Sequence, residues 1–304
     1  ALYHYAEWMM NQGRVVPLAD GNWRQEQDYV KALQLFRRLV AEFQKGETRY
    51  WEQAQQQIRN ITEVRVQVSV PHVFLPNSEI QFHLNWRNVK RVELALYPVD
   101  LTQDVNLARV DGTRRVDWLH SIELAGREKV KSWAHDTKDK NDYRPGNDTL
   151  RVDGKLRPGA YVLEEKADGQ SARDIVLVTD AALVLKASGK QALTYFCNAL
   201  NGSPLASGKV RLWQRYHENN RWHWREAEKQ TDKDGLAVFD LADIASNVEL
   251  FASAILTDRQ AFSLGNSHQS GRGQDQWRIY AFTDRPAYRP KETVNWKLMA
   301  RRYN

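Results

Sequence analysis

The residues of this chain whose side chains could do chemistry are few and widely spaced. Cys197 is the only cysteine among 304 residues, so the chain can form no internal disulfide. It lies in "LTYFCNAL", where it alternates with Tyr195. This position predicts a small, buried residue of a β-strand.

Two histidines are candidate ligands for a metal ion. His217 and His223 flank the aromatic stretch "WQRYHENNRWHWRE" and could meet across its turn. No cysteine or carboxylate pattern completes a set of ligands. The "DKDG" at Asp232–Gly235 lacks the spaced carboxylates and closing glutamate of a calcium loop, so it predicts a β-turn. We expect no metal.

The same stretch carries aromatic side chains that could stack on a sugar. These side chains have two interpretations: they form a sugar-binding platform, or they pack in a core or between domains. We favour packing. The residues concerned are Trp213, Tyr216, Trp222 and Trp224.

Catalytic motifs are absent from the sequence. It contains no G-x-S-x-G, H-E-x-x-H, P-loop or helix-opening G-x-G-x-x-G. Glu164 and Glu165 are adjacent in a predicted strand and therefore point to opposite faces. We expect no enzymatic activity and no cofactor.

Composition limits the partners. Hydrophobic residues make up 42% and aromatic residues 11% of the chain, enough for a sizeable core. The net charge of +6 arises from 44 basic and 38 acidic residues scattered along the sequence, which disfavours nucleic-acid binding. The longest apolar-rich stretch, "VELFASAIL", is far too short to cross a bilayer, so we expect no membrane insertion by this chain.

Residues 1–62 predict helices that would form an extension resembling a tetratricopeptide-type hairpin. Three apolar stripes predict three helices, and we interpret "VVPLADGN", between the first two, as a loop. Gly46 is expected just after the end of the second helix, and Thr48 is expected to cap the start of the third. The apolar stripes are Leu2, Tyr5, Ala6 and Met9; then Ala32, Leu33, Phe36, Leu39, Val40 and Phe43; then Trp51, Ala54, Ile58 and Ile61.

Residues 63–180 switch to a period of two, which predicts a first antiparallel β-sandwich with one face of each strand buried. Weaker strands are expected near Val105 and Ile122, a long polar loop over Ala134–Gly154, and a closing hairpin turn at Asp168-Gly169. The alternating apolar residues are Val64, Val66, Val68 and Val70; Ile80, Phe82, Leu84 and Trp86; and Val92, Leu94 and Leu96.

The pattern then repeats. Residues 181–271 predict a second sandwich, and residues 272–304 predict the start of a third that this chain does not complete. The fold class is therefore mainly β, with tandem antiparallel sandwiches behind a short helical region. Sandwiches joined end to end make a rod or an arch and not a compact enzyme. The second set of strands is "ALVLK", "QALTYFC", "KVRLWQRY", "RWHWREAE", "LAVFDL", "VELFASAIL" and "QAFSLG".

The last residues, "YAFTDRPAYRPKETVNWKLMARRYN", resemble the opening of a macroglobulin-like domain of the bacterial alpha-2-macroglobulin family. Lys291 departs from the pattern, because glycine is usual there. "RPGAYVLEEKADG" and "LNGSPLASGKVRLWQ" resemble other stretches of such domains. The matching residues are Thr283, Asp284, Arg285, Pro286, Tyr288, Arg289, Pro290, Glu292, Thr293, Val294 and Arg301.

The resemblance implies a function for the whole protein. It implies the N-terminal scaffold of a periplasmic envelope protein from a Gram-negative bacterium, which traps and inhibits proteases by enclosing them. Its partners would be target proteases and neighbouring macroglobulin-like domains. In family members of the trapping type, an internal thioester in a Cys-Gly-Glu-Gln type motif can bond the prey, and some family members lack it. Cys197 is followed by Asn198, Ala199 and Leu200 and does not match the motif. The alternative is a modular adhesion or glycan-binding rod.

Overall fold

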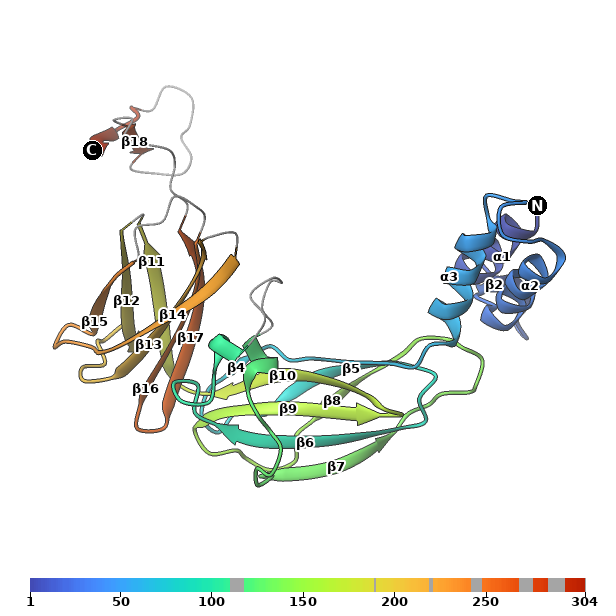
Figure 1. Cartoon of the computed structure of the whole chain (residues 1–304), viewed down its shortest axis with the longest axis horizontal. Coiled ribbons are helices and arrows are strands. Elements are labelled where there is room, and N and C mark those ends of the chain that lie inside the picture. The colour runs from blue at the N-terminus through green and yellow to red at the C-terminus, as the bar shows by residue number, and fades with distance from the viewer. Residues whose placement is uncertain are drawn as a thin grey trace.

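The computed structural model describes residues 1–109, 118–188, 190–218, 221–241, 248–267, 276–283 and 293–303. The chain is mainly β, with antiparallel sandwiches arranged in tandem behind three helices, so the predicted fold class is confirmed. The helical region and the second sandwich lie at opposite ends of the first sandwich (Figure 1).

The helical region packs around its own small core. Ala32, Leu33 and Phe36 of the second helix are almost fully buried against the first and third helices. The elements are α1 (Leu2–Asn11), β1 (Arg14–Pro17), β2 (Trp23–Glu26), α2 (Tyr29–Glu42) and α3 (Trp51–Thr62).

Two details of this region differ from the sequence prediction. The "VVPLADGN" stretch is not a plain loop, because its first residues form β1, which pairs with β2 as a hairpin. Both faces of this hairpin are largely exposed, so no alternation of apolar residues marked it. The predicted caps are also wrong: Gly46 lies beyond the end of α2, and Tyr50 rather than Thr48 is the N-cap of α3.

The first sandwich consists of a five-stranded sheet, in the order β4-β10-β9-β6-β7, and a three-stranded sheet, β3-β5-β8. The alternating valines and the apolar residues of "IQFHLNW", Ile80, Phe82, Leu84 and Trp86, face the core between the sheets, as predicted. Asp168 and Gly169 form the turn between β9 and β10 with positive φ, also as predicted. The strands are β3 (Arg65–Ser69), β4 (Val73–Phe74), β5 (Gln81–Arg87), β6 (Arg91–Val99), β7 (Lys131–Asp136), β8 (Gly146–Arg151), β9 (Gly159–Ala167) and β10 (Gln170–Val178).

Three predictions for the first sandwich are wrong. The regions of Val105 and Ile122 form no strand; 3₁₀ helices η1 (Leu107–Arg109) and η2 (Trp118–Ser121) lie there instead. The expected loop over Ala134–Gly154 contains β8 and part of β7, edge strands whose polar sequences disguise their alternating burial. Strand β6 is buried on both faces from Leu94 to Tyr97, and not on one face alone.

The second sandwich has a three-stranded sheet, β11-β12-β15, and a four-stranded sheet, β14-β13-β16-β17. All seven strands lie where the sequence predicts them. Its core is separate from that of the first sandwich. The strands are β11 (Ala181–Ala187), β12 (Gln191–Asn198), β13 (Lys209–Glu218), β14 (Arg221–Gln230), β15 (Leu236–Asp240), β16 (Val248–Leu256) and β17 (Arg259–Ser267).

A two-stranded ribbon follows, made of β18 (Gln276–Thr283) and β19 (Trp296–Tyr303). No described helix or strand crosses the predicted boundaries after residues 62, 180 and 271; the division into domains itself stays a prediction. None of the helices in the described ranges has the length and apolar character that crossing a membrane requires.

Candidate functional site: the joint between the sandwiches

The two sandwiches meet at a buried joint, formed by the segment after β6 and the face of the sheet β14-β13-β16-β17. The Leu101 N–H donates to Gln260 Oε1 at 2.8 Å, and Gln260 Nε2 donates to the Val99 carbonyl at 2.9 Å. Ser253 Oγ donates to the Leu101 carbonyl at 3.0 Å. Gln260 and Ser253 are buried, so these bonds form away from water.

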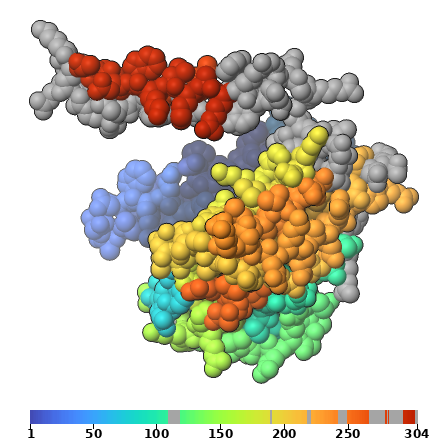
Figure 2. All heavy atoms as spheres, turned by 90° about the vertical axis from the view of Figure 1, so that its left-hand side faces the viewer, coloured from blue at the N-terminus to red at the C-terminus, as the bar shows by residue number. Residues whose placement is uncertain are grey.

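Aromatic side chains fill the apolar part of the joint. Trp118 of η2 packs against Phe251 of β16 and Phe262 of β17, with ring centroids 5.0 and 4.8 Å apart. Trp213 of β13 is fully buried in the same cluster. Figure 2 shows the second sandwich, in yellow and orange, resting directly on the green first sandwich. Such a buried aromatic contact stabilises one relative placement of the two sandwiches.

Charged side chains close the joint at its margins. Arg211 of β13 donates to the Thr102 carbonyl at 2.8 Å, pairs with Glu226 and lies over the Trp213 ring, 4.7 Å from its centroid. Arg259 of β17 pairs with Asp180, between the two sandwiches, at 2.8 Å. These contacts link β13 and β17 to the first sandwich and to the connection after it.

The segment that enters the joint is itself held in place by charge. Asp104 accepts two hydrogen bonds from Arg127, at 2.9 and 2.5 Å, and one from the Asp100 N–H at 2.7 Å. The hydrogen bonds to Asp104 raise the pKa of Arg127. The bidentate pair restrains the loop that contacts the second sandwich.

The candidate aromatic platform does not assemble. Trp213 is buried and Trp224 packs partly against the joint. Trp222 lies under the Arg215 guanidinium, 4.1 Å from the ring centroid. Tyr216 lies opposite His223, on the other face of the hairpin. From the sequence, packing in a core or between domains is favoured over a sugar-binding platform; Trp213 and Trp224 pack at the joint between the two sandwiches.

The two candidate metal ligands lie on opposite faces of the β13–β14 hairpin. His217 pairs across the strands with Trp222, whereas His223 pairs with Tyr216, the next position along β13. Adjacent positions of a strand point to opposite sides, so the two imidazoles cannot share an ion. Within the described residues, no group of three or more histidine, cysteine or acidic side chains is placed to hold a metal.

Cys197 is a buried residue of β12, as predicted. It lies opposite Ala182 of β11, and burial raises the pKa of its thiol. A buried thiol of raised pKa is a poor nucleophile at neutral pH.

Comparison with known proteins finds solved structures of similar fold. No family model matches the chain. A crystal structure of native alpha-2-macroglobulin from Escherichia coli spanning domains MG0-NIE-MG1 is similar, at 12% identity and a TM-score of 0.43, over 66% of this chain and 64% of that chain. The likeness is one of fold.

Two further structures show likeness of the same kind. One spans domains NIE-MG1 of the E. coli protein, at 11% identity and a TM-score of 0.40, over 66% of this chain and 98% of that chain. The other is a tetra-tandem repeat in the extending region of a large adhesion protein, at 12% identity and a TM-score of 0.24, over 68% and 50% of the two chains.

The residues that carry the sequence resemblance stay untested. Thr283 ends β18, whereas Asp284, Arg285, Pro286, Tyr288, Arg289 and Pro290 lie outside the described residues. Their assignment as a family motif remains a prediction from sequence.

Proposed function

We propose that this chain supplies scaffold modules of a macroglobulin-like envelope protein of a Gram-negative bacterium, which inhibits proteases by enclosing them in the periplasm. In this proposal the chain has no catalytic role and needs no cofactor. Its partners are the neighbouring domains of the full-length protein and, through that protein, the target proteases.

The observation that carries the proposal is the joint. Enclosure requires modules that move as rigid bodies, so that a change in one part displaces another. Gln260 and Ser253 bond the backbone of the first sandwich inside the joint. Trp118 of the first sandwich packs against Phe251 and Phe262 of the second. Buried contacts of this kind make the two sandwiches one arm. The resemblance of the Thr283–Arg301 stretch supports the choice of family.

Enclosure makes a specific kinetic prediction for the full-length protein. Incubated with an elastase-type protease, it should block cleavage of a protein substrate such as casein while the protease still hydrolyses a chromogenic tripeptide. Small substrates diffuse into an enclosure, whereas proteins do not. Equal inhibition of both substrates would indicate active-site blocking, and no inhibition of either would overturn the proposal.

A further inference from the structure

The seam between the helical region and the first sandwich is built differently from the joint between the sandwiches. Glu63 and Val64 are the residues between the end of α3 and the start of β3. The helical core and the core of the first sandwich are separate clusters. A hollow of about 390 Å³ lies in the seam, lined by Thr62 of α3 together with residues of the first sandwich. No shared core therefore places the helical region within the described part of the chain, and side chains at the surface have to do so.

The β5–β6 turn holds the last turn of α3. Arg87 Nη1 donates to the Asn60 carbonyl at 2.8 Å. Asn88 Nδ2 donates to the Ile61 carbonyl at 2.8 Å and to the Glu63 carbonyl at 3.0 Å. The last carbonyls of a helix have no partner inside the helix, so these bonds satisfy groups that α3 leaves unpaired. They all lie next to the connection to β3, so they fix a pivot and not the rest of the helical region.

A second contact is made by residues 137–145, between β7 and β8, which we call the strap. The Tyr143 side chain packs against the helical core. Arg144 Nη2 donates to the Gln27 carbonyl at 2.6 Å and lies 3.7 Å from the Glu26 carboxylate. These partners are the helical core and the segment that joins β2 to α2. The strap therefore contacts the helical region away from the pivot.

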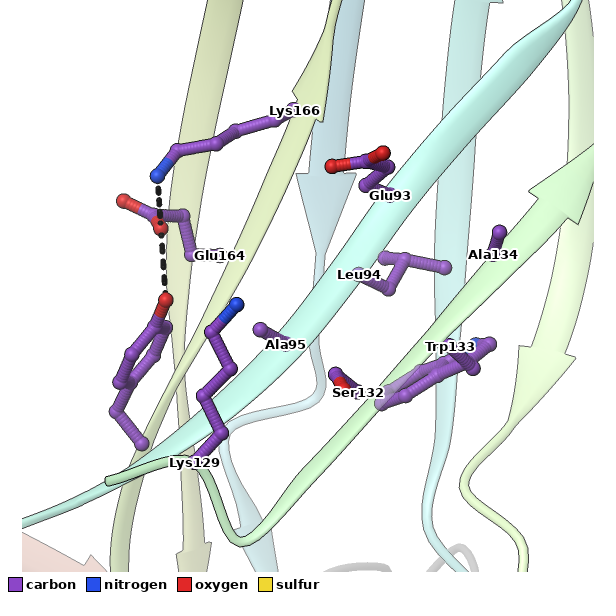
Figure 3. A pocket seen from close by; sticks show the side chains of 10 residues that line it. Glu93, Leu94, Ala95, Lys129, Ser132, Trp133, Ala134, Glu164 and Lys166 are labelled. Atoms are coloured by element: carbon purple, nitrogen blue, oxygen red, sulfur yellow. Dashed lines mark hydrogen bonds and ion pairs between the residues drawn. The ribbon is translucent and has the colours of Figure 1, made fainter. Parts of the chain in front are cut away.

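The base of the strap is fixed to both sheets of the first sandwich. Figure 3 shows Trp133 of β7 beside strand β6. At the end of β7, His135 Nε2 lies 3.0 Å from Asp148 Oδ2 of β8, a strand of the other sheet. The Thr137 N–H donates to the Lys90 carbonyl at 2.9 Å. A strap with a fixed base joins whatever its tip contacts to the sandwich as a whole.

The backbone of the strap is strained where its tip contacts the helical region. Tyr143 has φ of 62°, in the left-handed region that bulky residues rarely adopt. Strain of this kind persists only where surrounding contacts hold the residue in place. Here the contact is the packing of Tyr143 on the helical core. Undocking lets the strap relax, so strain partly offsets the contacts that keep the strap docked.

We propose that the strap holds the helical region against the first sandwich, and that its release lets the helical region swing as one body about Glu63 and Val64. The helical region stays folded when it swings, because every buried residue of its core comes from its own helices. The β5–β6 turn stays bonded to α3 at the pivot. This proposal does not depend on protease trapping.

The test measures a distance across the seam by double electron–electron resonance between two spin labels. The labels are attached to Gln34→Cys on α2 and Lys155→Cys in the first sandwich, both at exposed positions, in a Cys197→Ala background. The chain with an intact strap should give one narrow distance distribution. Tyr143→Ala combined with Arg144→Ala should at least double the width of that distribution, because both contacts of the strap are lost.

The matched control is Lys140→Ala combined with Asn141→Ala, at exposed positions of the same strap, of which Asn141 has a similar φ of 57°. It should leave the width unchanged. The helical signal in circular dichroism should be the same in all three proteins. An intact-strap distribution as wide as that of the strap variant, no widening in the strap variant, or equal widening in the control would each overturn the proposal. Loss of the helical signal in the strap variant would also overturn it, because the region would then unfold instead of swinging.

Discussion

At the scale of single residues, the two adjacent glutamates of β9 have opposite environments. Glu164 faces outward and is ionised within a network of donors. Glu165 faces the first core between Leu94 and Ala172, and neither of its carboxylate oxygens has a hydrogen-bond partner among the described residues. Desolvation raises the pKa of Glu165 to about 8, so it is neutral at pH 7. Alternation along the strand predicts that the two glutamates point to opposite faces, but it does not predict that both are buried.

The buried Glu165 should make stability depend on pH. The unfolded chain releases this proton near pH 4, whereas the folded chain keeps it until about pH 8. The pH-dependent part of the cost of burying this glutamate is therefore absent below pH 4, and it grows as pH rises toward 8. Glu165→Leu should raise the free energy of unfolding by about 2 to 4 kcal/mol at pH 8, and the gain should shrink toward pH 4.

Urea unfolding at pH 4, 6 and 8 measures this effect. Glu165→Gln is the control, because an amide stays polar but cannot ionise; it should remove the pH dependence attributed to this site. An identical pH dependence in wild type and Glu165→Gln would contradict the assignment.

At the scale of elements, the turn between β14 and β15 shows why one glycine is required. Gly235 has φ of 73°, and a Cβ there would lie 2.6 Å from the Phe196 carbonyl oxygen of β12. That carbonyl belongs to the sheet backbone and cannot move aside. The "DKDG" sequence predicted the turn, but the close approach of β12 comes from the tertiary fold.

Substitution of Gly235 should cost more than substitution of another glycine with positive φ. Gly235→Ala should lower the free energy of unfolding by about 2 to 4 kcal/mol, from backbone strain plus the clash. Gly169→Ala is the matched control: its φ is 80° and no atom lies within 4 Å of the added Cβ, so only the strain of about 1 kcal/mol applies. Equal losses in chemical denaturation would show that the contact with β12 is unimportant.

At the scale of the whole molecule, the joint decides whether two sandwiches act as one body. Gln260 is its central polar residue, because its amide bonds the backbone at both Val99 and Leu101. Without this side chain, a buried N–H and a buried carbonyl lose their partners. Each unsatisfied group costs about 1 to 3 kcal/mol.

Gln260→Ala should therefore loosen the joint without unfolding either sandwich. We expect the two sandwiches of the wild type to unfold in one calorimetric transition and those of the variant in two. Small-angle scattering should show a broader range of interdomain distances in the variant. Gln230→Ala, at an exposed position of β14, should change neither measurement. A single transition at unchanged temperature in Gln260→Ala would show that the joint is not the coupling element.

The sequence by itself determined the elements that alternate strongly. Strands such as β3, β5 and β15 bury one face each, so their apolar residues repeat at the period of a strand. The helices α2 and α3 likewise show their buried stripes. These local patterns also fixed the fold class, because short alternating strands without intervening helices can bury their apolar faces only between sheets.

Only the tertiary structure decided where exposed or doubly buried segments go. Edge strands β7 and β8 are too polar to show their pairing, and η1 and η2 are buried by contact with the joint and not by a period of their own. Ala95, Ser132 and Glu164, far apart in sequence, become neighbours on three strands. Such contacts depend on which strands pair, and alternation within one strand does not specify its neighbours.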